Sequence, residues 1–260
     1  MAQTPQSQSD TPPQILTCEN GEKIAYYLTP GASPGIIFLG GFMSDMAGAK
    51  AIALEQHCRT AGRAFLRFDY QGHGQSSGTF TDGCIGDWAS DATAALDALT
   101  EGPQILVGSS MGGWIMLLAA LARPARVAGL VGIAAAPDFT EALMWSSFSP
   151  KIRETIERDG VYYAPTEYGE QPYAITRKLI GDGRNHLLLD APIALHCPVH
   201  LIHGQQDPDV PWQHSLRTAE QLRSDQVAVT LIKDGDHRLS RDQDLARLCR
   251  ILDRMCEDRP

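Results

Sequence analysis

Short apolar segments of strand length alternate with segments of helical periodicity, and this alternation constrains the fold more than any other feature of the sequence. Strands are predicted at 23–28, 36–39, 64–68, 105–107, 127–134, 199–202 and 227–232, and helices at 49–60, 85–99, 114–122, 212–222 and 241–255. Successive parallel strands need a crossover connection, which is usually a helix. The sequence therefore predicts an α/β protein with a mostly parallel central sheet and helices on both of its faces.

The alternation stops between about 137 and 193, where aromatic residues and prolines are frequent. Helical patches are predicted there at 140–147, 150–158 and 173–179, and no strand is predicted. We interpret this segment as a small helical cap inserted into a single domain that covers 15–260, because a chain of this length can build one large core. Residues 1–14 are polar and proline-rich and are predicted to form a disordered tail.

Charge and composition exclude several classes of function. The chain has 22 Lys and Arg against 31 Asp and Glu, a net charge of −9, and no basic cluster suited to nucleic acid. No apolar run approaches the ~20 residues of a membrane span. The six cysteines form no C-x-x-C pair and the N-terminus has no targeting pattern, so we expect reduced thiols and a cytoplasmic protein. Composition gives no prediction of the oligomeric state.

A serine lies between a predicted strand and a wholly apolar helix in the segment LVGSSMGGWIMLL, residues 106–118. Only Ser110 is the central serine of a G-x-S-x-G motif, because Ser109 lacks a glycine two positions before it. An apolar helix is buried, and its N-terminal N–H groups and dipole would face Ser110. The alternatives are a glycine-rich turn with incidental serines or a phosphate-binding loop, but the nucleotide-binding glycine spacings are absent.

A serine nucleophile needs a histidine base and a carboxylate that orients the histidine. Two strands after the cap are followed by suitable residues, in the segments HGQQDPDVPW and DGDHR. The carboxyl ends of parallel strands meet at one edge of the sheet. We predict Asp207 as the acid and His237 as the base, with Asp209 as the rival acid.

Two backbone N–H groups are predicted to form an oxyanion hole, those of Met111 after the nucleophile and of Phe42 in the loop LGGFMSD. The histidines of HCPVHLIHG could suggest metal ligands. On a strand, however, His196 and His200 share one face and His203 points to the other, so core or strand-end roles are predicted. Neither a metal nor a cofactor is required.

The blocks FDYQGHGQSSG, GPQILVGSSMGGWIMLLAALARP, HGQQDPDVPW and DGDHR resemble the corresponding blocks of the α/β-hydrolase superfamily, and within it those of the abhydrolase-domain-10 family. The resemblance implies an α/β-hydrolase fold and a serine hydrolase with Ser110, Asp207 and His237 as its triad. It also implies palmitoyl-protein thioesterase or acyl-glucuronide esterase activity, on an acylated protein or a small ester.

Substrate contacts are predicted from chain position alone. Gly41 and Met43 adjoin the predicted oxyanion hole, Trp145 lies in the cap, and Val210 lies beside the predicted acid. The cap cations Arg153, Arg177, Lys178 and Arg184 could meet a substrate carboxylate or could simply be solvated. The predicted activity is hydrolysis of carboxylic esters or thioesters through an acyl-enzyme; a peptidase, a C–C bond hydrolase and a ligand receptor with little turnover are the alternatives.

Overall fold

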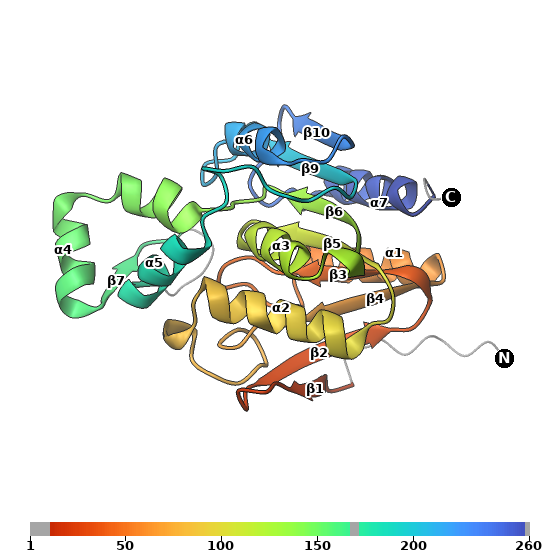
Figure 1. The fold of residues 1–260 in the computed structure, drawn as a ribbon, viewed down its shortest axis with the longest axis horizontal. Coiled ribbons are helices and arrows are strands. Elements are labelled where there is room, and N and C mark those ends of the chain that lie inside the picture. The colour runs from red at the N-terminus through yellow and green to blue at the C-terminus, as the bar shows by residue number, and fades with distance from the viewer. Residues whose placement is uncertain (1–10, 167–171, 258–260) are drawn as a thin grey trace.

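A computed structural model describes residues 11–166 and 172–257, and its centre is an eight-stranded sheet in the order β1-β2-β4-β3-β5-β6-β9-β10 (Figure 1). The strands are β1 (Gln14–Thr17), β2 (Lys23–Thr29), β3 (Ala32–Leu39), β4 (Arg63–Phe68), β5 (Gln104–Ser109), β6 (Val127–Ile133), β9 (Val199–Gly204) and β10 (Val227–Ile232). Within this sheet, β1 and β2 pair antiparallel with their neighbours, and the pairs from β4 to β10 are parallel. The predicted mostly parallel sheet is confirmed.

Helices cover both faces of this sheet (Figure 1). One buried cluster joins the sheet to α2 (Ile85–Leu99), α3 (Met111–Ala122) and α6 (Gln213–Gln221). A second cluster joins the opposite face to α1 (Ala49–Thr60) and α7 (Asp242–Glu257). Helix α3 is apolar all round because it packs against the sheet, α2 and the inserted segment at once, and this burial fixes the position of its N-terminus.

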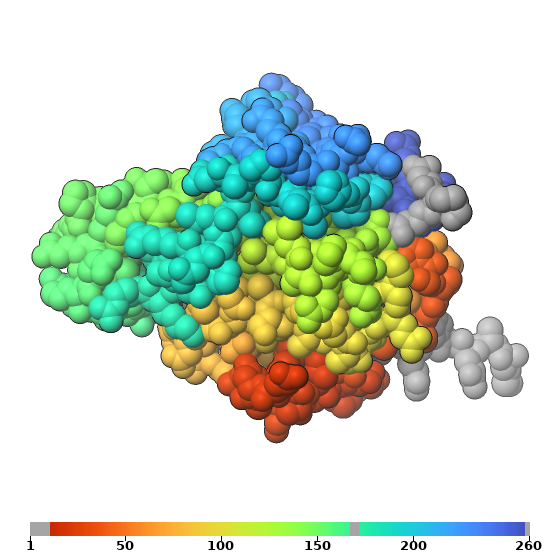
Figure 2. Space-filling view, in the orientation of Figure 1, coloured from red at the N-terminus to blue at the C-terminus, as the bar shows by residue number. Residues whose placement is uncertain are grey.

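The segment between β6 and β9 forms the cap, which projects from one side of the molecule (Figure 2). It contains a π-helical turn (Thr140–Trp145), α4 (Pro150–Asp159), β7 (Val161–Ala164), β8 (Tyr173–Thr176) and α5 (Arg177–Gly183). Strands β7 and β8 form an antiparallel two-stranded sheet. The prediction of a cap without strands is therefore wrong, and the helix predicted over 173–179 is a strand followed by a helix.

The two ends of the cap are tied together beside the sheet. Asp138 has a left-handed backbone (φ 60°), and its carboxylate accepts hydrogen bonds from the N–H groups of Leu188 and Leu189, both at 2.8 Å. His214 of α6 donates to the carbonyl of Pro137 at 2.6 Å. The insertion therefore leaves and rejoins the main domain at one place.

The N-terminal boundary differs from the sequence prediction at its last residue. Gln14, which was included in the predicted tail, begins β1 and pairs with Tyr26. A strand this short and mostly exposed has too few apolar residues to be recognised from the sequence. Positions 1–10 of the predicted tail lie outside the described residues. Within the described ranges, no helix has the length and apolar character of a membrane-spanning segment.

Candidate active site

Ser110 lies at the sharp turn between β5 and α3. Its backbone has φ 55° and ψ −120°, a region that is costly for any residue with a side chain. Three hydrogen bonds hold this conformation: the Ser110 N–H donates to Ile133 at 2.9 Å, and the Ser110 carbonyl accepts from Gly113 at 2.9 Å and from Ala136 at 3.1 Å. The turn therefore presents the serine side chain at the carboxyl edge of the sheet.

Two glycines make the turn possible. A Cβ atom at Gly108 would overlap the backbone of Gly112, and a Cβ atom at Gly112 would overlap the carbonyl oxygen of Leu39, both well inside the 3.0 Å that real Cβ atoms keep. Strand, turn and helix therefore approach one another more closely than a side chain allows. The glycines of the motif are required by this close approach.

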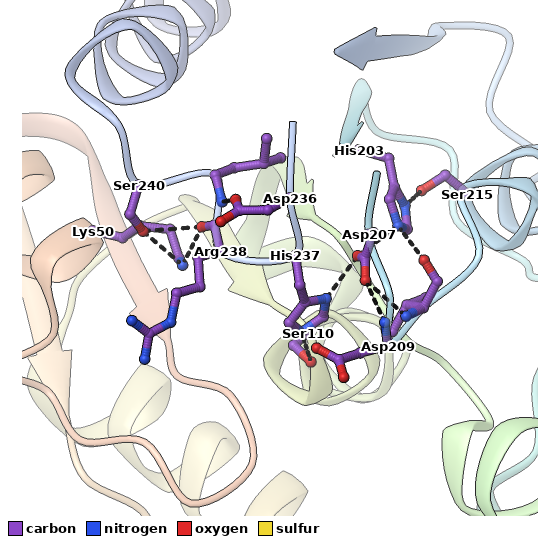
Figure 3. Close-up of polar contacts among 12 residues, drawn as sticks. Lys50, Ser110, His203, Asp207, Asp209, Ser215, Asp236, His237, Arg238 and Ser240 are labelled. Atoms are coloured by element: carbon purple, nitrogen blue, oxygen red, sulfur yellow. Dashed lines mark hydrogen bonds and ion pairs between the residues drawn. The ribbon is translucent and has the colours of Figure 1, made fainter. Parts of the chain in front are cut away.

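The structure brings together the three side chains of the predicted triad (Figure 3). His237 Nε2 lies 3.0 Å from Ser110 Oγ, and His237 Nδ1 lies 2.7 Å from Asp207 Oδ2. Because an ionised carboxylate can only accept, Nδ1 carries the proton and Nε2 is free to accept the serine proton. The Asp207 side chain is fully buried and that of His237 is 15% exposed, so the site is reached from the serine and histidine side.

The predicted acid Asp207 is hydrogen-bonded to the imidazole of His237. Its Oδ1 atom accepts the N–H groups of Asp209 at 2.8 Å and Val210 at 2.9 Å. Burial by itself would raise the pKa of Asp207, but hydrogen bonds from His203 and His237 hold this pKa below its usual value. The carboxylate therefore stays ionised and can stabilise a positively charged His237.

Side chains able to share one metal ion in the described part of the chain are Asp207, Asp209 and His237, whose ligand atoms lie within 4.8 Å of one another. Both oxygens of Asp207 already accept two hydrogen bonds each. This donor set suits a positioned carboxylate better than a metal ligand. Of the strand histidines, His200 contacts Thr230 and His203 contacts Ser215.

The loop after β3 lies against the nucleophile. A Cβ atom built on Gly41 would be 3.5 Å from the Cβ atom of Ser110. The Ser44 hydroxyl donates to the Gly41 carbonyl at 2.9 Å, and Met43, with φ 53°, is 39% exposed. The loop and the start of α3 therefore flank Ser110 on the side where an oxyanion would form. The roles of the Phe42 and Met111 N–H groups stay a prediction.

The ring of Phe42 joins the main domain to the cap. Its centroid lies 4.9 Å from that of Phe80, 5.8 Å from that of Phe139 and 5.5 Å from that of Tyr173, each in an edge-to-face arrangement. Tyr173 belongs to β8 of the cap. Because such aromatic contacts are worth ~0.5–1.5 kcal/mol each, this side chain anchors the loop that carries the predicted oxyanion donor.

The remaining predicted substrate contacts lie in different surroundings. Val210 is buried and its carbonyl accepts from His203 at 2.9 Å, so its backbone belongs to the structure that holds Asp207. Trp145 lies in the cap, where the guanidinium groups of Arg153 and Arg184 stand over its ring at 5.4 and 4.9 Å. These cations, and also Arg177 and Lys178, have partners within the protein.

Lys50 supports the site without having been singled out in the sequence. It lies at the start of α1 and donates to the carbonyl of Arg238 at 2.6 Å, directly after His237 (Figure 3). Burial lowers the pKa of Lys50 to about 8. This hydrogen bond connects the loop of His237 to α1, which is far away in the sequence. A single lysine in a helical pattern does not predict such a contact.

His73 is expected to make the stability of the folded protein depend on pH. It is buried among the rings of Tyr70, Phe80 and Trp88, and burial lowers the pKa of His73 to about 4. The unfolded chain therefore binds the proton more tightly, so the contribution of His73 to stability is full above about pH 6.5 and declines as the pH falls toward 4. The expected loss at pH 5 is about 2 kcal/mol of unfolding free energy.

Urea unfolding of the wild type and His73→Phe at pH 7.5 and pH 5 measures this contribution. The variant is expected to lose about 2 kcal/mol less than the wild type between the two pH values. Equal losses in the two proteins would show that His73 is not the group responsible.

Comparison with known proteins places this geometry in a family. The model of the alpha/beta hydrolase family matches residues 36–250. The mitochondrial palmitoyl-protein thioesterase ABHD10 of Mus musculus is 43% identical over 88% of this chain and 77% of its own length. The Homo sapiens protein of the same name is 41% identical over 88% of this chain and 75% of its own. Alpha/beta hydrolase domain-containing protein 10 from mouse has a solved structure that matches with a TM-score of 0.88 and 40% identity, covering 94% of this chain and 98% of that one.

One expectation from the sequence is wrong by this comparison. A cytoplasmic location was expected from the scattered cysteines and the absence of a targeting pattern, but the relatives that match over most of the chain are named as mitochondrial proteins. Cysteine spacing reports the redox state of a compartment, which several compartments share, and so it cannot distinguish between them.

The comparisons confirm three predictions from the sequence: the family resemblance, the fold and the class of reaction. The expected α/β-hydrolase fold and the expected hydrolysis of esters or thioesters are confirmed by the family match and by relatives named as thioesterases. The chain belongs to the alpha/beta hydrolase family, and within it to the group that includes the ABHD10 palmitoyl-protein thioesterases.

Proposed function

We propose that the chain hydrolyses acyl thioesters and esters through a covalent acyl-enzyme on Ser110, with His237 as the general base and Asp207 as the acid that orients it. The observation that carries the proposal is the continuous hydrogen-bonded path from Ser110 Oγ through both nitrogens of His237 to Asp207 Oδ2, with distances of 3.0 and 2.7 Å. Each distance is within the reach required for proton transfer or orientation.

Acylation begins when the Ser110 hydroxyl attacks the substrate carbonyl carbon while its proton passes to His237 Nε2. The resulting imidazolium is stabilised by the buried, ionised Asp207. The carbonyl oxygen becomes an oxyanion, which the N–H groups of Met111 and Phe42 would bind. His237 then gives its proton to the leaving thiol or alcohol as the bond to carbon breaks.

Deacylation repeats these steps with water as the nucleophile. His237 Nε2 takes a proton from water as the hydroxide adds to the acyl carbon, and the tetrahedral intermediate collapses to release the free acid and the Ser110 hydroxyl. His237 gives the proton taken from water to Ser110 Oγ as the bond between that oxygen and the acyl carbon breaks.

We propose S-acylated cysteine, including S-palmitoyl cysteine, as the substrate class. The support is the name of the relatives, palmitoyl-protein thioesterase, at 41–43% identity over most of the chain. Apolar side chains beside the nucleophile fit an acyl chain, because Met43 is exposed next to Gly41 and the ring of Phe42 lies between the main domain and the cap. Trp145 and Val210 are proposed as more distant contacts of the acyl chain.

A matched series of p-nitrophenyl esters and acyl thioesters from two to sixteen carbons tests the substrate class. We expect kcat/KM for the thioesters to rise with chain length, since each buried CH₂ contributes ~0.8 kcal/mol. Peak activity on short esters, with no turnover of thioesters, would reject the proposed substrate.

Labelling with a fluorophosphonate probe tests the mechanism independently of the substrate. The probe is expected to add one phosphonyl group to the peptide that contains Ser110, and prior labelling is expected to abolish turnover. A ligand receptor that has lost catalysis would show neither turnover of the esters nor a rate of labelling that depends on pH.

A further inference from the structure

The carboxylate of Asp207 has a second imidazole on the side away from His237. His203, the residue before the last one of β9, is completely buried. Its Nε2 atom lies 3.1 Å from Asp207 Oδ2 and 2.9 Å from the carbonyl oxygen of Val210, and its Nδ1 atom lies 2.7 Å from Ser215 Oγ (Figure 3). One atom, Asp207 Oδ2, therefore faces two histidines.

These contacts place a proton on Nε2 of His203. Nε2 faces a carboxylate oxygen and a carbonyl oxygen, both of which can only accept, so Nε2 is the donor. The Ser215 hydroxyl lies within hydrogen-bond distance of Nδ1, so both nitrogens of this buried ring have a partner.

His203 also fixes the geometry of the loop that carries the acid. The same N–H group is shared between the side chain of Asp207 and the backbone of Val210, and the N–H of Val210 returns a hydrogen bond to Asp207 Oδ1 at 2.9 Å. Rotation of the carboxylate would break contacts on both oxygens. His203, a residue of β9, therefore holds the Asp207 carboxylate in the orientation in which it contacts His237.

We propose that His203 is a positioning residue for the reaction: it locks Asp207 in the rotamer that aims Oδ2 at His237, and Ser215 locks His203 in turn. The structure thus extends the path of hydrogen bonds from Ser110 through His237, Asp207 and His203 to Ser215 of α6. This inference rests on the proposed role of Asp207. Its physical basis is that an imidazole base works only in one tautomer and one orientation, which its carboxylate must impose.

The test compares His203→Leu, which removes the donor, with His203→Gln, whose side-chain N–H₂ can replace the Nε2 donor. His203→Leu is expected to lower kcat by about 10- to 100-fold, less than the ~10⁴-fold of a lost acid, because Asp207 is present but free to rotate. KM is expected to stay within about twofold, since His203 is buried behind Asp207 and cannot touch substrate. His203→Gln is expected to recover at least about tenfold of the lost kcat.

The pH dependence separates positioning from general damage. When Asp207 is free to rotate away, it stabilises the protonated imidazole of His237 less, so the acid limb of the kcat/KM profile is expected to move to lower pH in His203→Leu. His200→Leu is the matched control, because His200 is on the same strand and bonds to Thr230 at 2.8 Å. The control is expected to keep both kcat and the profile of the parent.

Ser215→Ala keeps the proposal testable if His203→Leu does not fold. The hydroxyl contacts the far side of the imidazole of His203, so a positioning role predicts a fall in kcat of about threefold or more with KM unchanged. Parental kcat and an unshifted acid limb in Ser215→Ala would overturn the proposal, as would equal losses in His203→Leu and His200→Leu. If Ser110→Ala is itself as active as the parent, the proposed function fails, and that outcome is distinct from failure of the role of His203.

Discussion

Replacing Ser110 with alanine is expected to lower kcat on p-nitrophenyl esters by about 10⁴- to 10⁶-fold, because the acyl-enzyme cannot form without its oxygen. The fold should be unchanged, since the strained backbone of the turn is held by the hydrogen bonds of Ile133, Gly113 and Ala136, which alanine keeps. Binding of ester is expected to persist, so the loss should fall on kcat and leave KM nearly unchanged.

Ser109→Ala is the matched control for this prediction. Ser109 is the neighbouring serine, lies at the end of β5 and is buried, but its side chain has no place in the path from Ser110 to Asp207. Its variant is expected to keep activity within about threefold of the parent. Full activity of Ser110→Ala together with loss in Ser109→Ala would reverse the assignment of the nucleophile.

Replacing Gly112 with alanine is expected to destabilise the fold by at least about 3 kcal/mol, which is a large part of the stability of a domain. The added Cβ atom would overlap the carbonyl oxygens of Leu39 and Gly40, and both belong to a buried strand end that cannot move without shifting the adjacent oxyanion loop. These backbone atoms cannot move aside as the end of a flexible side chain can. Urea unfolding of the purified variant measures the loss, and residual folded protein is also expected to have reduced kcat.

Gly181→Ala is the matched control, a glycine-to-alanine change in another helix that is expected to raise the free energy of unfolding. Gly181 lies within α5, and a Cβ atom there would meet nothing within 4 Å. Alanine is expected to raise the unfolding free energy by about 0.5–1 kcal/mol, because it loses less backbone entropy than glycine in a helix. If Gly112→Ala were as stable as Gly181→Ala, the close approach of β3 and α3 would not be the reason for the glycine.

The main domain could be predicted closely because its elements are long and their patterns are strong. The helix predicted at 85–99 matches α2 at both ends, and the helix at 49–60 matches α1. In both, apolar side chains recur at helical spacing and bury against the sheet. Strands β2, β3, β4, β5 and β9 were predicted too short, since residues at their ends pair in the sheet without adding to the apolar run, whereas β10 has the predicted bounds and β6 ends one residue earlier than predicted.

The cap could not be predicted in the same way, because its pairing is not local. Tyr173–Thr176 has the composition of either a strand or the first turn of a helix. It is a strand because Val161–Ala164 lies beside it and pairs with it, and the helix begins only after Thr176, whose hydroxyl accepts from the N–H of Leu179 at 3.0 Å. Strand pairing across a loop depends on where the chain returns, which a local pattern does not record.

The sequence by itself determined the alternation of strands and helices, the nucleophile motif and the chain order of serine, acid and histidine, because each depends on local periodicity or on a short motif. Only the tertiary structure decided that Asp207 contacts His237, that His203 contacts Asp207, that Lys50 contacts the loop of His237, and that Phe42 reaches the cap. The physical reason is that hydrogen bonds and ring contacts act over a few ångströms. Residues far apart in sequence reach that range only after the sheet has set the spacing of its strand ends.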